Sequence, residues 1–567
     1  MAERPTPQQP AVLIVGAGPT GLAAAHLLGS RGVRVLLVER NATTSNDAKA
    51  ISLDDESLRT LQSAGVDEAV YPIIVPGTGT KYFGVGGRPL LHARGTGDQR
   101  FGHPFKNPFA QPDLERVLRE GLRGLPTVEV RFGTRLTTLA QEGDRVRASL
   151  RTDSPDGTTE DVGVSYVLGC DGGRSTVRDL LSIPMHGRSF PEVWLVADTL
   201  EDPHDQRYGM HYGDPARPVV IVPGHGGRCR YEFRLRPGEC EAGTPPPFEL
   251  VRQLLGPYRQ ITPEQVERAV AYSFHALLAD RLREGRCFLL GDAAHMMPPF
   301  AGQGLNSGLR DAANLCWKID EVLAGRAGDA LLDTYDTERR PHARAVIDLS
   351  VRLGRIVMTT SRGRARARDL LVRAVMRIPP GRRYLTEMRY RPDTRIRHGA
   401  VVHLGGPPQP LVGTPLPQPQ VLCGPRHLLT RFDDVTGRGW SLLGIGLSDA
   451  AWEAAARAAL PQAAHVDVYL DDRAARDRGG RTGITDADGR LDALFSDVTG
   501  HFVLVRPDRV VAAVFTPDRA ALVGAELRRL TTDGGHTAMS PHATAPASPG
   551  DTPPTPAVQP DPQGARR

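Results

Sequence analysis

The sequence has few cysteines, no long apolar run and little net charge. Its six cysteines form no CxxC pair and show no metal-ligand spacing with histidine, so we expect reduced, mostly buried thiols and neither a disulfide nor a metal site. No apolar run approaches the roughly 20 residues of a membrane-spanning helix, and residues 1–10 lack the apolar core of a signal peptide. These absences predict a soluble, cytoplasmic protein without a membrane partner.

The charged residues are spread over the chain. The formal net charge is +5 over 567 residues, and the arginines form no block. This distribution argues against a nucleic-acid partner and leaves a small anionic ligand open. Hydrophobic residues at 40% and charged residues at 24% are ordinary for a globular protein. The length predicts two or three folded units.

The pattern of apolar residues changes along the chain. Residues 11–40 read as strand, glycine turn, helix and strand, which is a parallel βαβ unit. Alternating stretches such as "RPVVIVPG" and "CRYEFRLRPGE" instead indicate antiparallel strands in a second lobe. A proline-rich connector over 400–420 precedes further strands, and the final stretch has too few large apolar residues to fold.

We therefore expect an α/β fold, α+β overall, in which a Rossmann-like domain carries an inserted antiparallel-sheet lobe for the substrate and is followed by a C-terminal domain. The expected boundaries are 1–185 for the first part of the Rossmann-like domain (with lobe strands near 76–108), 186–280 for the lobe, 281–400 for the second part and its helices, 401–530 for the C-terminal domain and 531–567 for a disordered tail.

The stretch "VGAGPTGL" carries a GxGxxG motif between a strand and a helix. Gly16 permits the tight turn, Gly18 lets a pyrophosphate approach the backbone, and Gly21 lets helix and strand pack closely. Glu39 ends the second strand, where a carboxylate would accept hydrogen bonds from an adenosine ribose. The alternative is a glycine turn in an ordinary crossover, with Glu39 as a solvated strand end. The motif alone does not choose between a nicotinamide and a flavin.

A second stretch, "GDAAHMMPPFAGQGLNSGL", favours the flavin. Asp292 follows a buried strand, where it could accept hydrogen bonds from a ribityl chain. Pro298 and Pro299 stiffen the turn, and residues 302–304 ("GQG") offer backbone N–H groups at a helix start that would stabilise negative charge on a reduced flavin. Asp292 could instead be a plain helix N-cap. His295 is more often a structural residue than a catalyst.

Three segments together resemble the flavin fingerprints of the single-component aromatic hydroxylases, the para-hydroxybenzoate hydroxylase-like FAD monooxygenases: "GAGPTGL", "CDGGRSTVR" and "GDAAHMMPPFAGQGLNSGLRDAANLCWK". The resemblance covers roughly residues 10–400. Further segments such as "AISLDDESLRTLQSAGV" and "RRYLTEMRYRPD" are most similar to the 3-(3-hydroxyphenyl)propionate hydroxylase branch. The resemblance implies bound FAD, NADH or NADPH as a transient electron donor, and transfer of oxygen from O2 to a small phenolic substrate through a flavin hydroperoxide.

The resemblance also implies cofactor contacts. Asp171 would lie near the pyrophosphate and Gln111 near the ribityl or phosphate region. Lys49 stands where the family usually has arginine, so its phosphate contact would lose the bidentate fork. The full predicted cofactor-binding set is Gly16, Ala17, Gly18, Pro19, Thr20, Gly21, Glu39, Arg40, Lys49, Gln111, Asp171, Gly291, Asp292, Pro299, Gly302, Gln303, Gly304, Leu305 and Asn306.

The substrate contacts and the C-terminal domain are less marked in the sequence. For a substrate with a propionate group, Arg217, Arg230 and Arg234 of the lobe are candidate partners, although each could be an ordinary surface arginine. No residue is singled out as the catalytic base.

The C-terminal domain resembles the thioredoxin-like appendage of larger family members. It holds only Cys423, which favours a structural or subunit-contact role, with a homodimer possible, over redox exchange.

Three functions remain open from the sequence. The first is hydroxylation of 3-(3-hydroxyphenyl)propionate and 3-hydroxycinnamate to the 2,3-dihydroxy products in aromatic catabolism. The second is the same chemistry on a polyketide or another phenol in secondary metabolism. The third is a flavin-binding protein without turnover.

Overall fold

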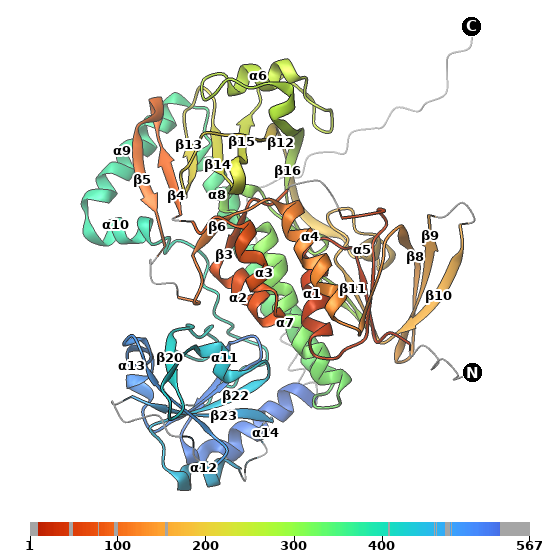
Figure 1. Ribbon diagram of the computed structural model, residues 1–567, viewed down its shortest axis with the longest axis vertical. Coiled ribbons are helices and arrows are strands. Elements are labelled where there is room, and N and C mark those ends of the chain that lie inside the picture. Colours follow the sequence, from red (N-terminus) through yellow and green to blue (C-terminus); the bar gives the residue numbers. More distant parts are fainter. Residues whose placement is uncertain are drawn as a thin grey trace, which may run out of the picture. The chain divides into compact units, whose positions relative to one another are not determined.

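The structure is a computed structural model (Figure 1). It describes residues 9–44, 49–77, 79–95, 100–153, 157–405, 409–456, 458, 460, 462–470, 477 and 479–532. Most of the predicted disordered tail, residues 533–567, lies outside these ranges, whereas Thr531 and Thr532 end a helix. Within the described ranges, no helix combines the length and the hydropathy needed to cross a membrane.

The first sheet contains the predicted βαβ unit. Its order is β17-β18-β11-β1-β2-β7, and its neighbours are parallel except for the edge strand β17. The strands are β1 (Val12–Val15), β2 (Val35–Val38), β7 (Val128–Arg131), β11 (Tyr166–Gly169), β17 (Arg283–Glu284) and β18 (Cys287–Leu289). Every residue of β1, β2 and β11 is buried, which explains the uninterrupted apolar runs in the sequence.

The helices α1 (Pro19–Gly29) and α7 (Gly304–Leu323) pack against each other beside this sheet (Figure 1). At the start of α1, Gly21 lets the helix lie against the loop after β1, because a Cβ at this position would lie 2.0 Å from the carbonyl oxygen of Gly16. Helices predicted within residues 281–400 are present, with α7 followed by α8 (Ala330–Val357).

The second large sheet has eight strands in the order β19-β16-β12-β15-β14-β13-β4-β5. The strands are β4 (Thr80–Phe83), β5 (Pro89–Ala93), β12 (Met185–Thr199), β13 (Gly209–Tyr212), β14 (Val219–Pro223), β15 (Cys229–Arg234), β16 (Val266–Ala279) and β19 (His295–Met296). All neighbours are antiparallel except β13 and β4, which are parallel. Strands from 80–93 thus complete a sheet whose other members come mostly from 185–279.

Smaller elements join the two sheets. The pair β3 (Ser52–Asp54) and β6 (Lys106–Pro108) is antiparallel, with Asp54 opposite Lys106. Helix α2 (Asp55–Ala64) follows β3 directly, and α4 (Gln111–Gly121) follows β6. The antiparallel strands β8 (Thr134–Glu142), β9 (Arg145–Thr152) and β10 (Thr159–Val164) form a separate sheet.

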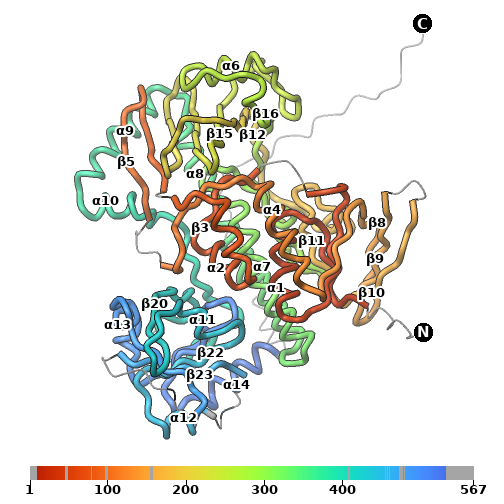
Figure 2. Tube along the Cα trace, viewed as in Figure 1, coloured from red at the N-terminus to blue at the C-terminus, as the bar shows by residue number. Residues whose placement is uncertain are grey.

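The C-terminal elements gather around their own seven-stranded sheet, shown in blue in Figure 2. Its order is β21-β20-β24-β23-β22-β25-β26, with parallel pairs β22–β23 and β23–β24 and antiparallel pairs elsewhere. The strands are β20 (Gln420–Cys423), β21 (Leu428–Arg431), β22 (Trp440–Ile445), β23 (Ala463–Tyr469), β24 (Thr482–Asp486), β25 (Phe502–Val505) and β26 (Val511–Phe515). The thioredoxin-like assignment and the domain boundaries stay predictions.

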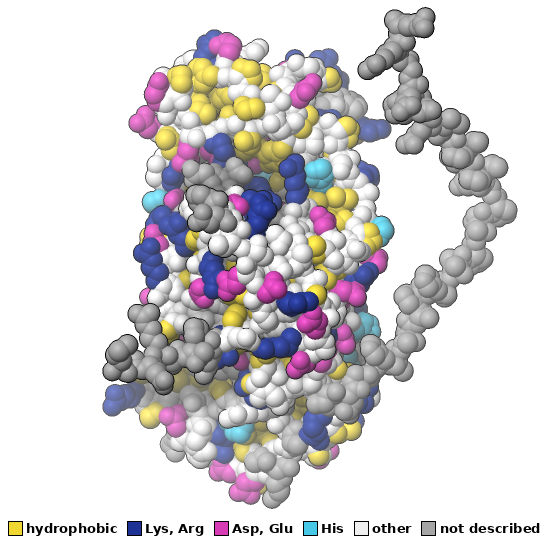
Figure 3. Space-filling model, turned by 90° about the vertical axis from the view of Figure 1, so that its right-hand side faces the viewer, with side chains coloured by type: hydrophobic (Ala, Val, Ile, Leu, Met, Phe, Trp, Pro, Cys, Tyr) yellow, Lys and Arg dark blue, Asp and Glu magenta, His cyan; other side chains and the backbone are white. Residues whose placement is uncertain are grey.

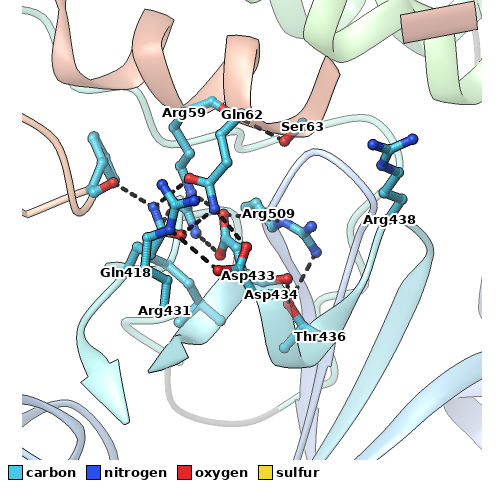
Figure 4. Close-up of polar contacts among 12 residues, drawn as sticks. Arg59, Gln62, Ser63, Gln418, Arg431, Asp433, Asp434, Thr436, Arg438 and Arg509 are labelled. Carbon is cyan, nitrogen blue, oxygen red and sulfur yellow. Dashed lines mark hydrogen bonds and ion pairs between the residues drawn. The ribbon is translucent and has the colours of Figure 1, made fainter. Parts of the chain in front are cut away.

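Polar side chains connect the C-terminal elements with helix α2 (Figure 4). Arg59 of α2 pairs with Asp433 of α11 (Phe432–Thr436), and Gln62 donates to Gln418 at 2.9 Å. On the outer face shown in Figure 3, basic and acidic side chains are interspersed rather than gathered by sign.

Candidate active site

One cavity of about 850 Å³ lies between the parallel sheet and the eight-stranded sheet. The loops that follow β1, β2, β11 and β18 line one part of it. These loops start at the carboxyl ends of parallel strands, which is where open α/β sheets bind ligands. The inner face of the eight-stranded sheet lines the other part.

The glycine-rich loop forms the floor of the first part. Gly16 has a φ of +103°, and a Cβ there would lie 2.5 Å from the carbonyl oxygen of Cys170. A Cβ on Gly18 would instead meet no described atom within 4 Å, so the cavity is open directly over this backbone. Glycine is therefore required at position 16 by the fold, whereas at position 18 it leaves space for a ligand to approach the backbone.

Glu39 lies beside this loop at the end of β2. Its Oε2 accepts a hydrogen bond of 2.9 Å from the backbone N–H of Ala17, and its Oε1 accepts one of 2.7 Å from Nδ2 of Asn41. Glu39 lines the cavity and is only half-buried. Its carboxylate is thus held in one orientation while keeping room for a ligand hydroxyl. Arg40, next to it, is exposed and also lines the cavity.

The second predicted stretch forms the opposite wall. Asp292 belongs to a short 3-10 turn, Gly291–Ala293, and faces the cavity. Desolvation raises the pKa of its carboxyl group, and this effect outweighs the lowering of the pKa by Lys49 and His295. Its carboxylate makes no hydrogen bond to a described residue, and it caps no described helix. It therefore remains available to a ligand.

Helix α7 begins at the cavity. Within the described part of the chain, the side chain of its N-cap residue, Gln303, makes no capping hydrogen bond to the first turn of the helix. Gly302 precedes it with a φ of +63°. The first backbone N–H groups of a helix have no partner within the helix, so this end can donate hydrogen bonds to an anionic or carbonyl ligand. Pro299, Gly304 and Leu305 line the same wall.

Asn306 does not line the cavity, contrary to our prediction. It is 1% exposed, and its Nδ2 donates to the carbonyl oxygens of Gly302 at 2.7 Å and Ser52 at 3.1 Å. The amide ties α7 to β3 and so fixes the glycine turn from behind. Gly21 likewise lies behind the loop, packed on Gly16.

The residues taken from the family resemblance all line the cavity, with some of their polar atoms already bonded. Both carboxylate oxygens of Asp171 accept hydrogen bonds at the start of α5 (Thr176–Leu180), from Ser175 at 2.5 Å and Val177 at 3.1 Å. Burial raises the pKa of Asp171. Gln111 accepts a 2.8 Å bond from the N–H of Ala50 and so holds the loop that carries Lys49.

His295 is a structural residue. It is completely buried, and its Nε2 lies 2.7 Å from Oδ2 of Asp311, which also accepts from the N–H of Gly291. Burial alone would raise the pKa of Asp311, but His295 and Arg339 lower it to about 2. The ionised carboxylate therefore anchors the turn that presents Asp292.

The inner face of the eight-stranded sheet is largely apolar and aromatic. Paired residues of neighbouring strands share a face, and alternate residues of one strand return to it. Val220, Val222 and Phe274 occupy this face and pack with Trp194 and Phe300 in one buried cluster. The ring centroids of Trp194 and Phe300 are 5.4 Å apart. Such a wall suits a flat aromatic ligand and excludes water.

The sequence analysis missed several polar residues on this part of the cavity, among them Lys106, His211, Glu232 and Arg268. Glu232 and Arg268 follow the period-2 alternation of β15 and β16, which was a usable signal. His211 and Lys106 had none, because β13 and β6 are short and reach the cavity only through tertiary pairing. Burial lowers the pKa of His211 to about 3 and that of Lys106 to about 8.

The three arginines predicted for the substrate are not placed as expected. Arg217 pairs with Glu239 at 2.6 Å and Arg234 with Glu192 at 3.1 Å, and neither lines the cavity. Arg230 is 1% exposed, pairs with Asp198 at 2.7 Å and donates to the carbonyl oxygen of Lys49. Because each guanidinium is committed to a carboxylate of the protein, we do not retain these residues as substrate contacts.

A group of possible metal ligands lies outside the cavity. Asp202, His204 and Cys229 have ligand atoms within 4.8 Å of one another. The Asp202 carboxylate already pairs with Arg259 at 2.9 Å and accepts a bond from Tyr231 at 3.0 Å. A guanidinium at this distance supplies the positive charge that a cation would otherwise provide.

The donor set of the cavity fits FAD. One continuous space is lined by the open backbone at Gly18 and the oriented carboxylate of Glu39. It is also lined by the carboxylate of Asp292 and the start of α7, neither of which has a side-chain partner among the described residues. An extended dinucleotide needs such groups at separated points, and here they come from the ends of three parallel strands and one helix.

Comparisons with known proteins agree with this geometry. A family model described as FAD binding domain matches residues 9–350, and one described as HcaD C-terminal domain matches residues 413–530. The 3-(3-hydroxy-phenyl)propionate/3-hydroxycinnamic acid hydroxylase of Mycobacterium sp. (strain JLS) is 39% identical over 543 residues, which cover 93% of each chain. The protein of the same name from Klebsiella pneumoniae is 37% identical over 532 residues, 92% of this chain and 94% of the relative.

Solved structures also match over most of the chain. Aklavinone-11 hydroxylase in a ternary complex with FAD and aklavinone is 26% identical, with a TM-score of 0.72, and the match covers 93% of this chain and 99% of that one. Anhydrotetracycline hydroxylase from Streptomyces rimosus is 27% identical, with a TM-score of 0.70, over 92% of this chain and 99% of that one.

Proposed function

Because this chain belongs to the FAD-dependent aromatic hydroxylases, a family of monooxygenases that use NADH or NADPH and O2, we propose that it hydroxylates 3-(3-hydroxyphenyl)propionate and 3-hydroxycinnamate to their 2,3-dihydroxy products. The observation that carries the proposal is the single cavity in which the nucleotide-type loop meets an aromatic wall. The relatives that are 37–39% identical bear the name of this activity, whereas the aklavinone-11 and anhydrotetracycline hydroxylases are 26–27% identical.

In this proposal the chain's own residues divide into two groups. The loop at Gly18, the carboxylates of Glu39 and Asp292, and the start of α7 hold the cofactor. When bound, FAD supplies the redox chemistry, with electrons from NADH or NADPH and activation of O2. The remaining assigned cofactor residues (Ala17, Pro19, Thr20, Arg40, Lys49, Gln111, Asp171, Gly291, Pro299, Gln303 and Leu305) line the same space.

In this proposal, the eight-stranded sheet forms the part of the cavity that binds the substrate. Phe274, Phe300 and Val222 exclude water and hold an aromatic ring flat beside the glycine turn at 302–304. The cations that line this part of the cavity are Lys106 and Arg268. Arg268 pairs with Asp198, as does Arg230, so Lys106 is the less neutralised of the two.

The test is oxidation of NADH and NADPH by the purified yellow holoenzyme, with and without 3-(3-hydroxyphenyl)propionate or 3-hydroxycinnamate, with the product followed by mass. The proposal expects strong stimulation and a gain of one oxygen atom. Bound flavin without stimulation by either acid would overturn the substrate assignment and leave the cofactor site standing. A cytoplasmic location and a homodimer belong to the same proposal, and the expected mass of the dimer is checked by light scattering.

A further inference from the structure

Lys106 occupies an unusual place for a lysine. It belongs to β6, and its Nζ donates a hydrogen bond of 2.8 Å to Oγ1 of the buried Thr80. The same Nζ lies 4.0 Å from the position that a Cβ on Gly302 would occupy. The ammonium group therefore reaches the point where the aromatic wall meets the glycine turn in front of α7.

Within the described part of the chain, this cation has no carboxylate within ion-pair distance. Lys106 forms no ion pair with any described residue. The carboxylate of Asp54, whose charge does reach Lys106, is committed to Arg310 at 2.6 Å and to the N–H of Ser57 at 2.9 Å. A second cation, Arg391, adds to the positive potential at Lys106. Enclosing an ammonium group without a carboxylate partner costs free energy, and a bound anion would offset this cost.

The choice of lysine at this position is also informative. Only four of the chain's 70 Lys and Arg residues are lysines: Lys49, Lys81, Lys106 and Lys318. A guanidinium stays charged in every protein environment, whereas an enclosed ammonium can exchange its proton near neutral pH. His211, which is also close enough to Lys106 to interact electrostatically, is neutral at pH 7 because burial lowers its pKa to about 3.

We propose that Lys106 contacts the phenolic oxygen of the bound substrate and holds that oxygen as phenolate. The inference rests on the proposed function and adds the residue that ionises the ring. A phenolate pushes electron density into the ring positions beside it, which is where an electrophilic oxygen attacks. The phenolic end is assigned rather than the propionate because Nζ lies beside Gly302, and the ring that is hydroxylated must lie against the cofactor there.

The proton balance follows from the two charge states of Lys106. When Nζ is already an ammonium group, binding the phenol as phenolate breaks the O–H bond and releases one proton to solvent. When Nζ is a neutral amine, the phenolic proton moves to Nζ, and no proton enters or leaves the site. A carboxylate partner would behave differently, since a carboxylate carries no proton at neutral pH: binding would release none at low pH and take one up at high pH.

The experiment is isothermal titration of the oxidised holoenzyme with 3-(3-hydroxyphenyl)propionate in buffers of different ionisation enthalpy, at pH 7 and pH 9.5. The proposal expects release of about one proton at pH 7 and about none at pH 9.5, with the red-shifted absorption of phenolate in the difference spectrum at both. No release at pH 7 with uptake at pH 9.5 would assign Lys106 to the propionate and overturn the proposal.

Variants make the result specific. Lys106→Met should abolish both the proton release and the phenolate absorption and lower kcat by about 100-fold, the size of a typical proton-transfer contribution. Lys106→Arg should restore the phenolate at pH 7 and keep the proton release at pH 9.5, because the guanidinium does not titrate. Lys81→Met, on strand β4 and outside the residues that line the cavity, should match the wild type.

Two further controls separate other causes. If Lys106→Met changes the reduction potential of FAD without substrate and leaves the proton release intact, Lys106 contacts the cofactor and the proposal is wrong. Phenylpropionate, which lacks the hydroxyl, should bind with no proton release. Failure of the wild type to bind either acid would instead contradict the proposed function. FAD content and melting temperature show whether each variant is folded, and Lys106→Gln replaces Lys106→Met if that variant does not fold.

Discussion

The guanidinium of Arg59 donates to both carboxylate oxygens of Asp433, Nε to Oδ2 and Nη2 to Oδ1, at 2.6 Å each. The two residues are 374 positions apart, one in α2 and the other in α11 of the C-terminal elements (Figure 4). Both are nearly inaccessible to solvent, at 5% exposure each. Helix α2 follows β3 of the active-site region directly, so the C-terminal elements are anchored next to the cofactor cavity.

Breaking this pair should destabilise the protein. Arg59→Met leaves the buried Asp433 with the longer contact to Arg509, at 3.4 Å, as its one remaining ion pair among the described residues, and we expect a loss of about 3 to 5 kcal/mol in the free energy of unfolding. Urea unfolding measures it. The double variant Arg59→Met, Asp433→Leu should recover most of the loss. The matched control is Arg252→Met, which breaks an exposed pair with Glu249 and should reduce stability far less, because solvent screens that pair. Equal losses of unfolding free energy in Arg59→Met and Arg252→Met would show that the buried pair stabilises the protein no more than an exposed pair does.

The two glycines of the first loop should fail in opposite ways. Gly18→Ala meets no described atom within 4 Å and needs only a φ of −75°, so the fold should be retained while FAD binding weakens at least tenfold. Gly16→Ala adds a Cβ 2.5 Å from Cys170 at a φ of +103°, so we expect destabilisation by more than about 1 kcal/mol. Flavin fluorescence and thermal unfolding test the pair. A Gly18→Ala variant with wild-type FAD affinity would remove the phosphate assignment.

Glu39 should contribute affinity through its charge. Replacing Glu39 with Ala removes an acceptor that would bind the ribose hydroxyls, and charge-assisted hydrogen bonds of about 1.5 to 3 kcal/mol predict a 10- to 150-fold weaker FAD complex. The dissociation constant is measured after removal and return of FAD. Glu129→Gln, an exposed position on the neighbouring strand β7, is the control and should bind FAD normally. An unchanged constant in Glu39→Ala would place the adenosine elsewhere.

The apoprotein should become more stable as the pH rises from 8 toward 10.5. Desolvation and the charge of Arg391, against that of Asp54, lower the pKa of Lys106 from 10.5 to about 8 in the folded state, so the unfolded chain binds more protons in this window. The gain is at most about 3 kcal/mol. Lys106→Met removes the titrating group. The melting temperature of this variant should therefore not show the rise between pH 8 and pH 10.5 that the wild type shows. A parallel pH dependence in both proteins would contradict the shifted pKa.

The parts of this protein that depend on neighbouring residues in the chain were readable from the sequence. The βαβ unit, its glycine turn and Glu39 lie within about 30 residues, and the turn geometry leaves few residue types possible. The same holds for the segment from Asp292 to Gly304, where a buried strand, a stiff turn and a helix start follow one another. Local sterics and periodicity therefore predicted the cofactor side of the cavity.

On the substrate side, the tertiary structure decided which charged residues reach the cavity unpaired and which are neutralised. Lys106 and His211 lie on strands of three and four residues that reach the cavity only because β6 pairs with β3 and β13 with β4. Arg217 and Arg234 looked like anion partners in the sequence, but the fold placed Glu239 and Glu192 against them. A charge becomes available to a ligand only when folding leaves it without a partner, and that depends on residues distant in the sequence.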